Sequence, residues 1–234
     1  MAGGSGAPGA ERPAPGPAGT PGAEAGSSEA VSVRLWLVRH GETEWARDGR
    51  HTGRTDIPLT DKGREQAASL RGRLEAERFA AIRCSPLYRA RETLELALPG
   101  AVPELDDDLQ ERDYGAAEGR TTAELREGQP GWTSWTTATP GAESIDDVGV
   151  RADRAIARAV AAGRHAVDDA DPRAPHDTPG AAVLVVAHGH LLRILAARWL
   201  EQPAGFGAQL VLGTATVSVL GAERGRPALV RWNA

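Results

Sequence analysis

Two histidines follow apolar stretches of the chain in nearly the same way. His40 stands in the segment LVRHG at 37–41, and His188 stands in VAHGH at 186–190. In an open parallel sheet, ligands collect at the carboxyl ends of the strands where the strand order reverses. A single histidine after a strand is more often structural. Two of them, each followed by glycine and one preceded by an arginine, predict a shared cleft.

Arginines near these histidines indicate what the cleft binds. A dianionic phosphate needs positive charge and forked donors, which the planar and always protonated guanidinium supplies. Arg39 directly precedes His40, and Arg89 falls in the first turns of a helix that Ser85-Pro86 is expected to open. The free amides and the dipole at the start of a helix also favour an anion. The residue types therefore predict a phosphate site that contains a histidine.

Four separated segments carry related motifs in order along the chain: RHGETEW at 39–45, SPLYRARET at 85–93, ERDYGAAEG at 111–119 and HGH at 188–190. Together they resemble the signature of the histidine phosphatase superfamily, which includes the cofactor-dependent phosphoglycerate mutases. The resemblance extends from about residue 34 to residue 220. Four blocks in the expected order are a highly specific signal.

The resemblance implies a role for each residue that would touch the phosphoryl group. His40 would be the nucleophile, attacking phosphorus from its unprotonated nitrogen to give a phosphohistidine intermediate. Arg39, Arg89 and His188 would bind the non-bridging oxygens and offset their charge, and Gly189 would add a backbone amide. Positioning and electrostatics would then supply most of the rate.

The resemblance also implies a proton-transfer group and a substrate loop. Glu111 would protonate the leaving oxygen and later, as a base, activate the water that frees the histidine. Segment 50–56 resembles the substrate loop of the family, which makes Thr52 and Gly53 candidate substrate-binding residues and places His51 at the rim.

One residue that differs from many relatives indicates which branch of the family the chain resembles. At the position of Ala46 many relatives carry an asparagine that contacts phosphate, and a methyl group cannot donate that hydrogen bond. A small residue there, with the sequence HTG at 51–53, is more similar to the acid phosphatase and sugar-bisphosphatase branch than to the mutases. Mutase chemistry also needs a second anchor for a doubly charged substrate. The chain between Glu111 and His188 is poor in lysine and has no adjacent arginine pair.

We therefore expect a phosphomonoester hydrolase of the acid phosphatase type that acts on a small phosphorylated metabolite. Two alternatives stay open, namely phosphoryl transfer of the phosphoglycerate mutase type and a non-catalytic phosphate-binding regulatory module on the same fold. The regulatory module is disfavoured because every expected catalytic residue is present.

Two other enzyme classes fit the sequence poorly. A cysteine-dependent phosphatase needs an arginine six positions after its nucleophile, but from Cys84 that position is Ala90, so Cys84 is expected to be a small buried apolar residue. A metal site could start from His188 and His190, but no obvious cluster of further ligands accompanies them. No metal and no cofactor are expected.

Composition and charge limit the remaining classes. A chain of 234 residues with 41% hydrophobic content can bury the core of one catalytic domain. The net charge of −5 argues against a nucleic-acid partner, because such proteins usually carry a basic patch. No apolar run reaches the roughly 18 to 20 residues of a membrane span, and the N-terminus lacks a secretory pattern. We expect a cytoplasmic protein; its oligomeric state cannot be read from the sequence.

The segments that must position the site alternate short apolar runs with helical periods. This pattern predicts an α/β fold of three layers, α/β/α, with a mostly parallel central sheet, like that of the phosphoglycerate mutases. Strands are expected at 31–38, 79–84 and 181–187, late or edge strands at 214–220 and 227–232, and helices after Thr60, Ser85 (86–98), Thr121 and Ser144 and at 191–200.

Composition also predicts the domain limits. Residues 1–30 are an Ala/Gly/Pro-rich segment expected to form a disordered tail, and 31–234 form the catalytic domain. A Pro/Asp-rich stretch at 163–180 is expected to be a disordered loop. Trp45, Trp132 and Trp135 are expected to pack in the interior rather than to line the pocket mouth.

Overall fold

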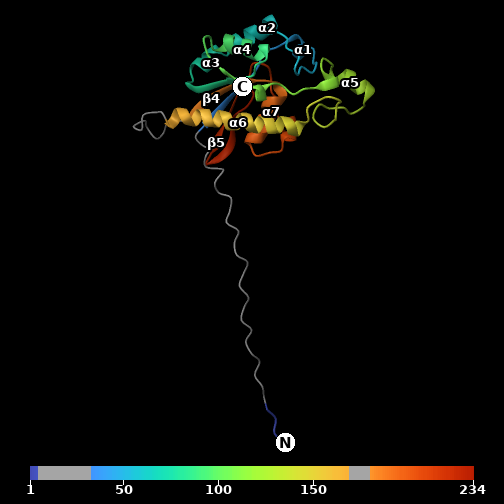
Figure 1. Cartoon of the computed structure of the whole chain (residues 1–234), viewed down its shortest axis with the longest axis vertical. Helices are drawn as coiled ribbons and strands as arrows, with labels where there is room; N and C mark the ends of the chain where they lie inside the picture. The colour runs from blue at the N-terminus through green and yellow to red at the C-terminus, as the bar shows by residue number, and fades with distance from the viewer. Residues whose placement is uncertain (5–32, 169–179) are drawn as a thin grey trace.

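Six strands form one mixed sheet in the computed structural model, in the order β3-β2-β4-β1-β5-β6. Helices cover both sides of this sheet (Figure 1). The structure describes residues 1–4, 33–168 and 180–234. The strands are β1 (Val33–Arg39), β2 (Phe79–Cys84), β3 (Glu104–Leu105), β4 (Ala181–Ala187), β5 (Val217–Glu223) and β6 (Arg226–Arg231). The helices are α1 (Glu44–Arg47), α2 (Asp61–Ser69), α3 (Arg71–Glu75), α4 (Tyr88–Ala97), α5 (Thr122–Gly128), α6 (Ile145–Asp168) and α7 (Gly189–Trp199), and short 3-10 turns are η2 (Asp107–Leu109), η3 (Gly115–Ala117) and η4 (Ala204–Gln209).

The order of the strands reverses between β1 and β4. Strands β1, β2, β3 and β4 run parallel, whereas β5 and β6 pair antiparallel at one edge, so the sheet is mostly parallel as predicted. From β1 the chain continues to β2, which lies beyond β4 in the sheet, and from β4 it continues to β5, which lies beyond β1. The two connections therefore run in opposite directions along the sheet. A crevice is expected where two such connections diverge. Arg39 at the end of β1 is paired in register with Ala187 at the end of β4. His40 and His188 are the next residues, so they lie at the carboxyl ends of two adjacent strands.

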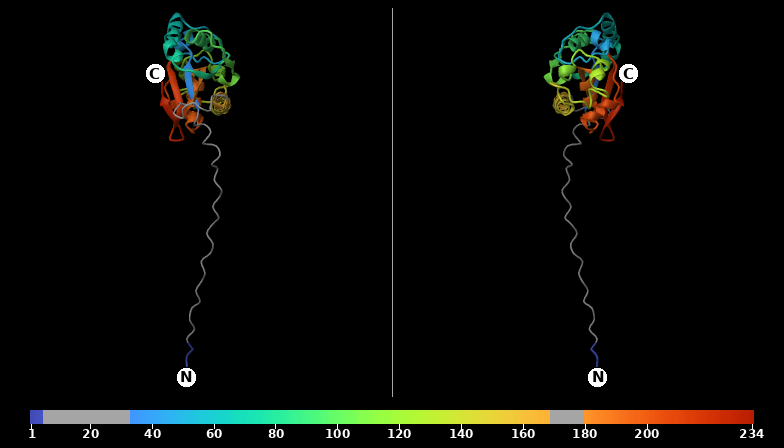
Figure 2. Two further views of the ribbon diagram at one scale, coloured as in Figure 1. Left: turned by 90° about the vertical axis from the view of Figure 1, so that its left-hand side faces the viewer. Right: turned by 90° about the vertical axis from the view of Figure 1, so that its right-hand side faces the viewer.

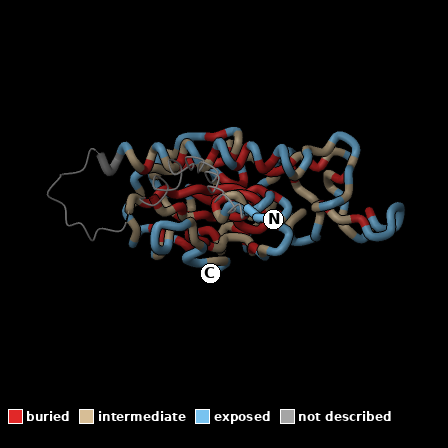
Figure 3. Tube along the Cα trace, turned by 90° about the horizontal axis from the view of Figure 1, so that it is seen from below, coloured by how far each residue is buried: buried red, intermediate tan, exposed pale blue. Residues whose placement is uncertain are grey.

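The two faces of the sheet carry separate apolar cores, because side chains alternate along each strand. Leu35 and Leu37 of β1 pack with α6 and α7, while Trp36 and Val38 pack on the side of α2, α3 and α4. Figures 1 and 2 show these two groups of helices on opposite sides of the sheet. Buried residues run through the strands between them (Figure 3). The predicted three-layer α/β/α architecture is confirmed.

Several local predictions agree with the structure. Strands β2 and β4 have the predicted limits. The Thr60 hydroxyl caps α2 by accepting from the amide of Gly63, and Thr121 with Glu124 forms a reciprocal capping box at α5. The Ser144 hydroxyl accepts from an amide in the first turn of α6. These caps work because hydroxyl oxygens satisfy amides that the helix leaves unpaired.

Other local details differ from the prediction. Helix α4 begins at Tyr88 rather than Pro86, its N-cap is Leu87, and the Asp56 carboxylate accepts from the Tyr88 amide at 2.8 Å. The Ser85 hydroxyl was predicted to cap this helix but lies 2.7 Å from a ring nitrogen of His188. Helix α7 begins two residues earlier than predicted, and the short edge strand β3 was not predicted.

Helix α6 is longer than the sequence suggested. It continues to Asp168, so residues 163–168 are helical although a loop was predicted to begin at Gly163. A Cβ atom on Gly163 would lie 2.9 Å from a methyl carbon of Val33, so this glycine permits close packing on β1 instead of ending the helix. The remainder of the predicted loop, at 169–179, and residues 5–32 lie outside the described residues, so the predicted tail stays a prediction. No helix in the described part of the chain combines the length and apolar character needed to cross a membrane.

Close backbone contact fixes the loop that follows β1. A Cβ atom on Gly63 would lie 2.1 Å from the carbonyl oxygen of Glu42, and one on Gly41 would lie 2.4 Å from the carbonyl oxygen of Gly63. Only residues without side chains allow this approach. Helix α2 therefore holds the segment that carries His40.

Candidate active site

A cavity of about 200 Å³ opens at the carboxyl ends of β1 and β4. Most of the residues that line it bring hydrogen-bonding or charged groups. They are Arg39, His40, Ala46, Gly49, Arg50, His51, Thr52, Glu111, Tyr114, Gly189, His190, Arg193 and Leu212. The cavity thus gathers residues from four of the segments that the sequence singled out, at 39–45, 50–56, 111–119 and 188–190.

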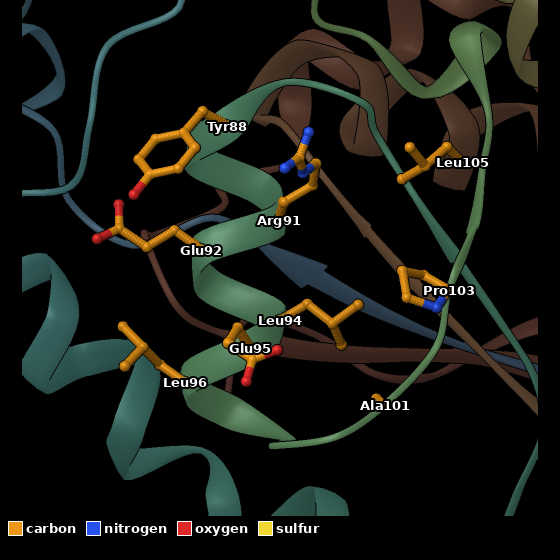
Figure 4. Close-up of a pocket in the computed structure, with 9 residues that line it drawn as sticks. All are labelled: Tyr88, Arg91, Glu92, Leu94, Glu95, Leu96, Ala101, Pro103 and Leu105. Atoms are coloured by element: carbon orange, nitrogen blue, oxygen red, sulfur yellow. The ribbon is translucent and has the colours of Figure 1, made fainter.

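A larger hollow of about 480 Å³ lies elsewhere, beside α4. Figure 4 shows Arg91, Glu92 and Glu95 on this helix, with Pro103 and Leu105 across the gap. None of its lining residues was predicted to take part in chemistry. The smaller cavity is therefore the candidate active site.

His40 is buried and held in one tautomer. Its Nδ1 lies 2.7 Å from the carbonyl oxygen of Gly41, which can only accept a hydrogen bond, so Nδ1 carries the proton and Nε2 is unprotonated. Burial, together with the positive charges of Arg89 and Arg39, lowers the pKa of His40 well below its ordinary value. The ring is therefore a neutral imidazole with a free lone pair on Nε2.

His188 packs beside His40 with a ring-to-ring distance of 5.2 Å. Its Nε2 lies 2.7 Å from the Ser85 hydroxyl, which itself accepts from the amide of Leu87. The Ser85 proton is therefore available to His188 Nε2, which leaves Nδ1 able to carry the ring proton. Burial and the charge of Arg89 lower the pKa of His188 well below its ordinary value.

Backbone carbonyls fix the two predicted phosphate-binding arginines. Arg39 Nη1 donates to the carbonyl oxygen of Leu212 at 2.6 Å. Arg89 is fully buried, and its two terminal nitrogens donate to the carbonyl oxygens of Thr55 and Gly53 at 3.0 and 2.8 Å. Arg89 and His188 lie close to His40 but are not among the residues that line the cavity.

Three buried nitrogens around His40 have no hydrogen-bond partner. Among the described residues only four buried side-chain nitrogen or oxygen atoms lack one, and three of them are Arg39 Nε, Arg89 Nε and His188 Nδ1. The fourth is Trp36 Nε1. Leaving a buried polar group unpaired costs about 1–3 kcal/mol. An anion with several oxygens placed beside His40 would offset this cost at all three atoms.

Glu111 lines the cavity and is held by backbone amides. Its Oε1 accepts from the amides of Arg112 and Leu191, and its Oε2 accepts from the amide of His190, at 2.9 to 3.0 Å. The two latter amides belong to the first turn of α7, whose N-cap His188 makes no side-chain cap. Glu111 therefore caps α7 from a distance, and this contact fixes the carboxyl group relative to His188.

A contact between Tyr114 and His190 is not evident from the sequence. The Tyr114 hydroxyl lies 2.7 Å from His190 Nδ1, and the Ser134 hydroxyl lies 3.0 Å from His190 Nε2. Both ring nitrogens of His190 are thus engaged, so neither is available to a metal. In the described part of the chain, no three His, Cys, Asp or Glu residues gather as metal ligands. Tyr114 belongs to the ERDYGAAEG block, but the spacing of the residues in this block does not predict a contact with His190.

The secondary candidates fall in different places. Thr52, His51 and Gly189 line the cavity, whereas Gly53 does not and instead accepts a hydrogen bond from Arg89. A Cβ atom on Gly189 would lie 3.3 Å from the guanidinium carbon of Arg39, so this glycine allows the arginine to approach α7.

The predicted interior residues do not line the cavity. Trp132 is buried with Tyr114, and Trp135 packs against the core of α6 and α7. Cys84 is buried, and burial raises the pKa of its thiol to about 12. The thiol is therefore protonated at neutral pH and is not a nucleophile.

The lowered pKa of His40 predicts how this ring titrates. Its NMR signal, assigned by comparison with His40→Gln, should show no protonation midpoint near pH 6.5 and should change only in more acidic solution. The urea-unfolded chain serves as the control and should titrate normally. Because unfolded His40 binds a proton below about pH 6.5 and the folded ring does not, the free energy of unfolding should fall as the pH drops through that value. A folded-state midpoint at or above pH 6.5 would refute the proposed charge environment.

Comparison with known proteins agrees with this geometry. The family model described as "Histidine phosphatase superfamily (branch 1)" matches residues 35–234. An acid phosphatase of Mycobacterium tuberculosis is 40% identical over 195 residues, which cover 82% of this chain and 88% of that protein. Sedoheptulose 1,7-bisphosphatase of Saccharomyces cerevisiae is 34% identical over 204 residues, covering 76% and 70%.

Solved structures and a mutase relative extend the comparison. A mycobacterial glucosyl-3-phosphoglycerate phosphatase solved with VO3 is 31% identical with a TM-score of 0.73, covering 86% of this chain and 98% of that one. A 2,3-bisphosphoglycerate-dependent phosphoglycerate mutase of Gloeobacter violaceus is 34% identical over 172 residues, covering 69% and 73%. The family model spans nearly all of the described fold. The chain belongs to the histidine phosphatase superfamily and is an enzyme, a phosphatase.

Proposed function

We propose that this phosphatase hydrolyses small phosphomonoesters through a phosphoryl group carried on Nε2 of His40. The observation that carries the proposal is the set of three unpartnered buried nitrogens, Arg39 Nε, Arg89 Nε and His188 Nδ1, around a neutral imidazole. They would donate to the non-bridging oxygens of the phosphoryl group. Relatives named as an acid phosphatase and a sugar bisphosphatase support a small phosphorylated metabolite as the substrate.

In the first half-reaction His40 Nε2 attacks phosphorus. The P–N bond forms while the bond from phosphorus to the leaving oxygen breaks, and the leaving oxygen takes a proton from Glu111. Glu111 Oε2 accepts one amide hydrogen bond, so its other lone pair is available to hold that proton. The arginines, whose guanidinium groups stay charged, offset the negative charge of the oxygens throughout.

In the second half-reaction a water molecule replaces the departed alcohol. Glu111, now a carboxylate, takes a proton from this water, and the water oxygen attacks phosphorus as the P–N bond breaks. Inorganic phosphate leaves and His40 returns to its neutral form. The hydrogen bond from Nδ1 to the Gly41 carbonyl keeps the ring oriented in both steps. A cytoplasmic location is part of the same proposal.

Replacing the nucleophile tests this function directly. His40→Ala should abolish the release of inorganic phosphate from any phosphomonoester, because the variant lacks the imidazole nitrogen that would accept the phosphoryl group. Phosphate release and urea unfolding should be measured together. The variant should unfold cooperatively, since the ring leaves only its bond to Gly41 unmade. Turnover by a folded His40→Ala chain at the wild-type rate would exclude the mechanism.

Replacing Glu111 by glutamine, which can neither donate nor accept the proton, should affect the two half-reactions differently with different leaving groups. Glu111→Gln should slow hydrolysis of an alkyl phosphate by about 10²–10⁴-fold, because its leaving oxygen needs a proton. With p-nitrophenyl phosphate, whose leaving group needs none, the variant should release a burst of about one p-nitrophenolate per site and then stall, because the water lacks its base. Stopped-flow absorbance measures both.

The exposed Glu127→Gln on α5 is the matched control and should behave as the wild type. Because Glu111 also caps α7, the thermal stability of Glu111→Gln should be recorded beside its kinetics. Equal slowing of both substrates without a burst would contradict the acid–base role.

A further inference from the structure

We propose that Arg151 is a positioning residue that holds the Glu111 carboxyl group where it can exchange protons with the leaving oxygen and with the attacking water. Arg151 belongs to α6 and is not among the residues that line the cavity, so it would act only through the segment that carries Glu111. This assignment rests on the proposed function, because the acid–base role of Glu111 belongs to that proposal.

The segment around Glu111 has little regular structure of its own. One short turn, η2, precedes Glu111, and residues 111–114 belong to no helix or strand. Buried backbone groups in such a segment must find hydrogen-bond partners elsewhere in the fold. Leu109 of η2 packs in the core with Val148 and Ala152 of α6. The position of this segment therefore depends on α6.

Arg151 provides a hydrogen-bond donor to two carbonyl groups of the segment. Its Nη1 donates to the carbonyl oxygens of Asp108 and Gln110 at 2.7 and 3.0 Å, and Gln110 directly precedes Glu111. The arginine side chain is buried. Because a guanidinium is planar and always charged, it fixes the carbonyl groups that it binds more rigidly than a single flexible donor would.

Glu143, just before α6, holds the same guanidinium from its other side. The two carboxylate oxygens accept from Arg151 Nε and Nη2 at 2.6 and 2.8 Å. The backbone of Glu143 binds the residues after Glu111, since its amide donates to the carbonyl oxygen of Asp113 at 3.0 Å and its carbonyl oxygen accepts from Arg112 Nε at 2.7 Å. Arg151 and Glu143 thus hold the chain on both sides of Glu111.

The side chain of Glu111 reaches from this segment to another helix. Its carboxylate oxygens accept from the amides of His190 and Leu191 in α7 at 3.0 Å. Helix α6 lies beside α7 (Figure 1). The Arg151 and Glu143 contacts therefore fix the backbone of Glu111, while α7 fixes its carboxyl group. A displacement of about 1 Å at a reacting group can cost about 10²-fold in rate.

Arg154, one turn farther along α6, provides a matched control. Its Nε donates to the Asp108 carboxylate at 3.0 Å, so it contacts the same segment through a side chain. The Arg154 side chain is half exposed, and ion pairs of this kind contribute little. Arg154→Met should therefore behave as the wild type in every measurement below.

The first test compares two leaving groups. Arg151→Met should lower kcat for ethyl phosphate by about 10–10²-fold, because a displaced Glu111 protonates the leaving oxygen poorly. The KM should change little, because the three unpartnered donors around His40 are untouched. The first turnover of p-nitrophenyl phosphate, whose leaving group needs no proton, should keep its rate in stopped-flow absorbance. Equal slowing of both substrates would contradict the positioning role.

A double-mutant cycle shows whether Arg151 acts through Glu111. In the Glu111→Gln background, Arg151→Met should cause no further loss of kcat for ethyl phosphate, since the group that it positions is already gone. Arg151→Lys keeps the charge and should recover part of the rate in the otherwise wild-type chain. Losses that multiply in the double variant would overturn the inference.

Amide hydrogen exchange tests the position of Glu111 without any turnover. In folded Arg151→Met the amides of His190 and Leu191 should exchange about tenfold faster or more, while the amide of Leu195 inside α7 keeps its protection. Wild-type exchange at both positions would refute the assignment. If Arg151→Met does not fold, Glu143→Gln, which weakens the hold on the guanidinium, takes its place in all three measurements and should give the same pattern.

Failure of the proposed function would look different. Glu111→Gln, in which Arg151 is intact, would then hydrolyse ethyl phosphate at the wild-type rate. In that case the exchange of the His190 and Leu191 amides decides alone whether Arg151 positions the carboxyl group. Faster exchange at these two amides would support the assignment, and unchanged exchange would overturn it.

Discussion

The site depends on burying three nitrogen donors without partners beside a neutral histidine. Each of Arg39 Nε, Arg89 Nε and His188 Nδ1 carries a cost of about 1–3 kcal/mol that the fold must offset. The other atoms of these groups are fixed by distant segments, through the carbonyls of Leu212 and Gly53 and the hydroxyl of Ser85. In the proposed mechanism the arrangement is therefore prepared before substrate binds, and an anion would gain hydrogen bonds without reorganising the protein.

The same positive charges act twice. With burial they lower the pKa of His40, so the ring is neutral. In the proposed mechanism they also attract the oxygens of the phosphoryl group that this ring would accept. Glu111 links the chemistry to the fold in a similar way, because it caps α7 through the amides of His190 and Leu191 and presents its carboxyl group to the cavity. A substitution at such positions affects both stability and catalysis, which is why the two must be measured together.

From the sequence we could predict the helices and strands that have local patterns, and the candidate site residues that lie within recognisable motifs. The strands before His40 and His188 and the Thr121 capping box were found because apolar runs and capping patterns are local. Contacts between distant segments were missed: Ser85 to His188 spans 103 positions, and no spacing along the chain reports it.

The atom of the protein that carries the phosphoryl group during turnover decides between His40 Nε2 and any other acceptor. Wild-type enzyme mixed with p-nitrophenyl phosphate is quenched in alkali within the first turnover, digested, and examined by mass spectrometry and by ³¹P NMR. Because Nδ1 is held by the Gly41 carbonyl, we expect up to one phosphoryl group per chain, on Nε2 of His40. A protein that hydrolyses the substrate without ever carrying phosphate, or that carries it on Nδ1 or on another residue, would contradict it.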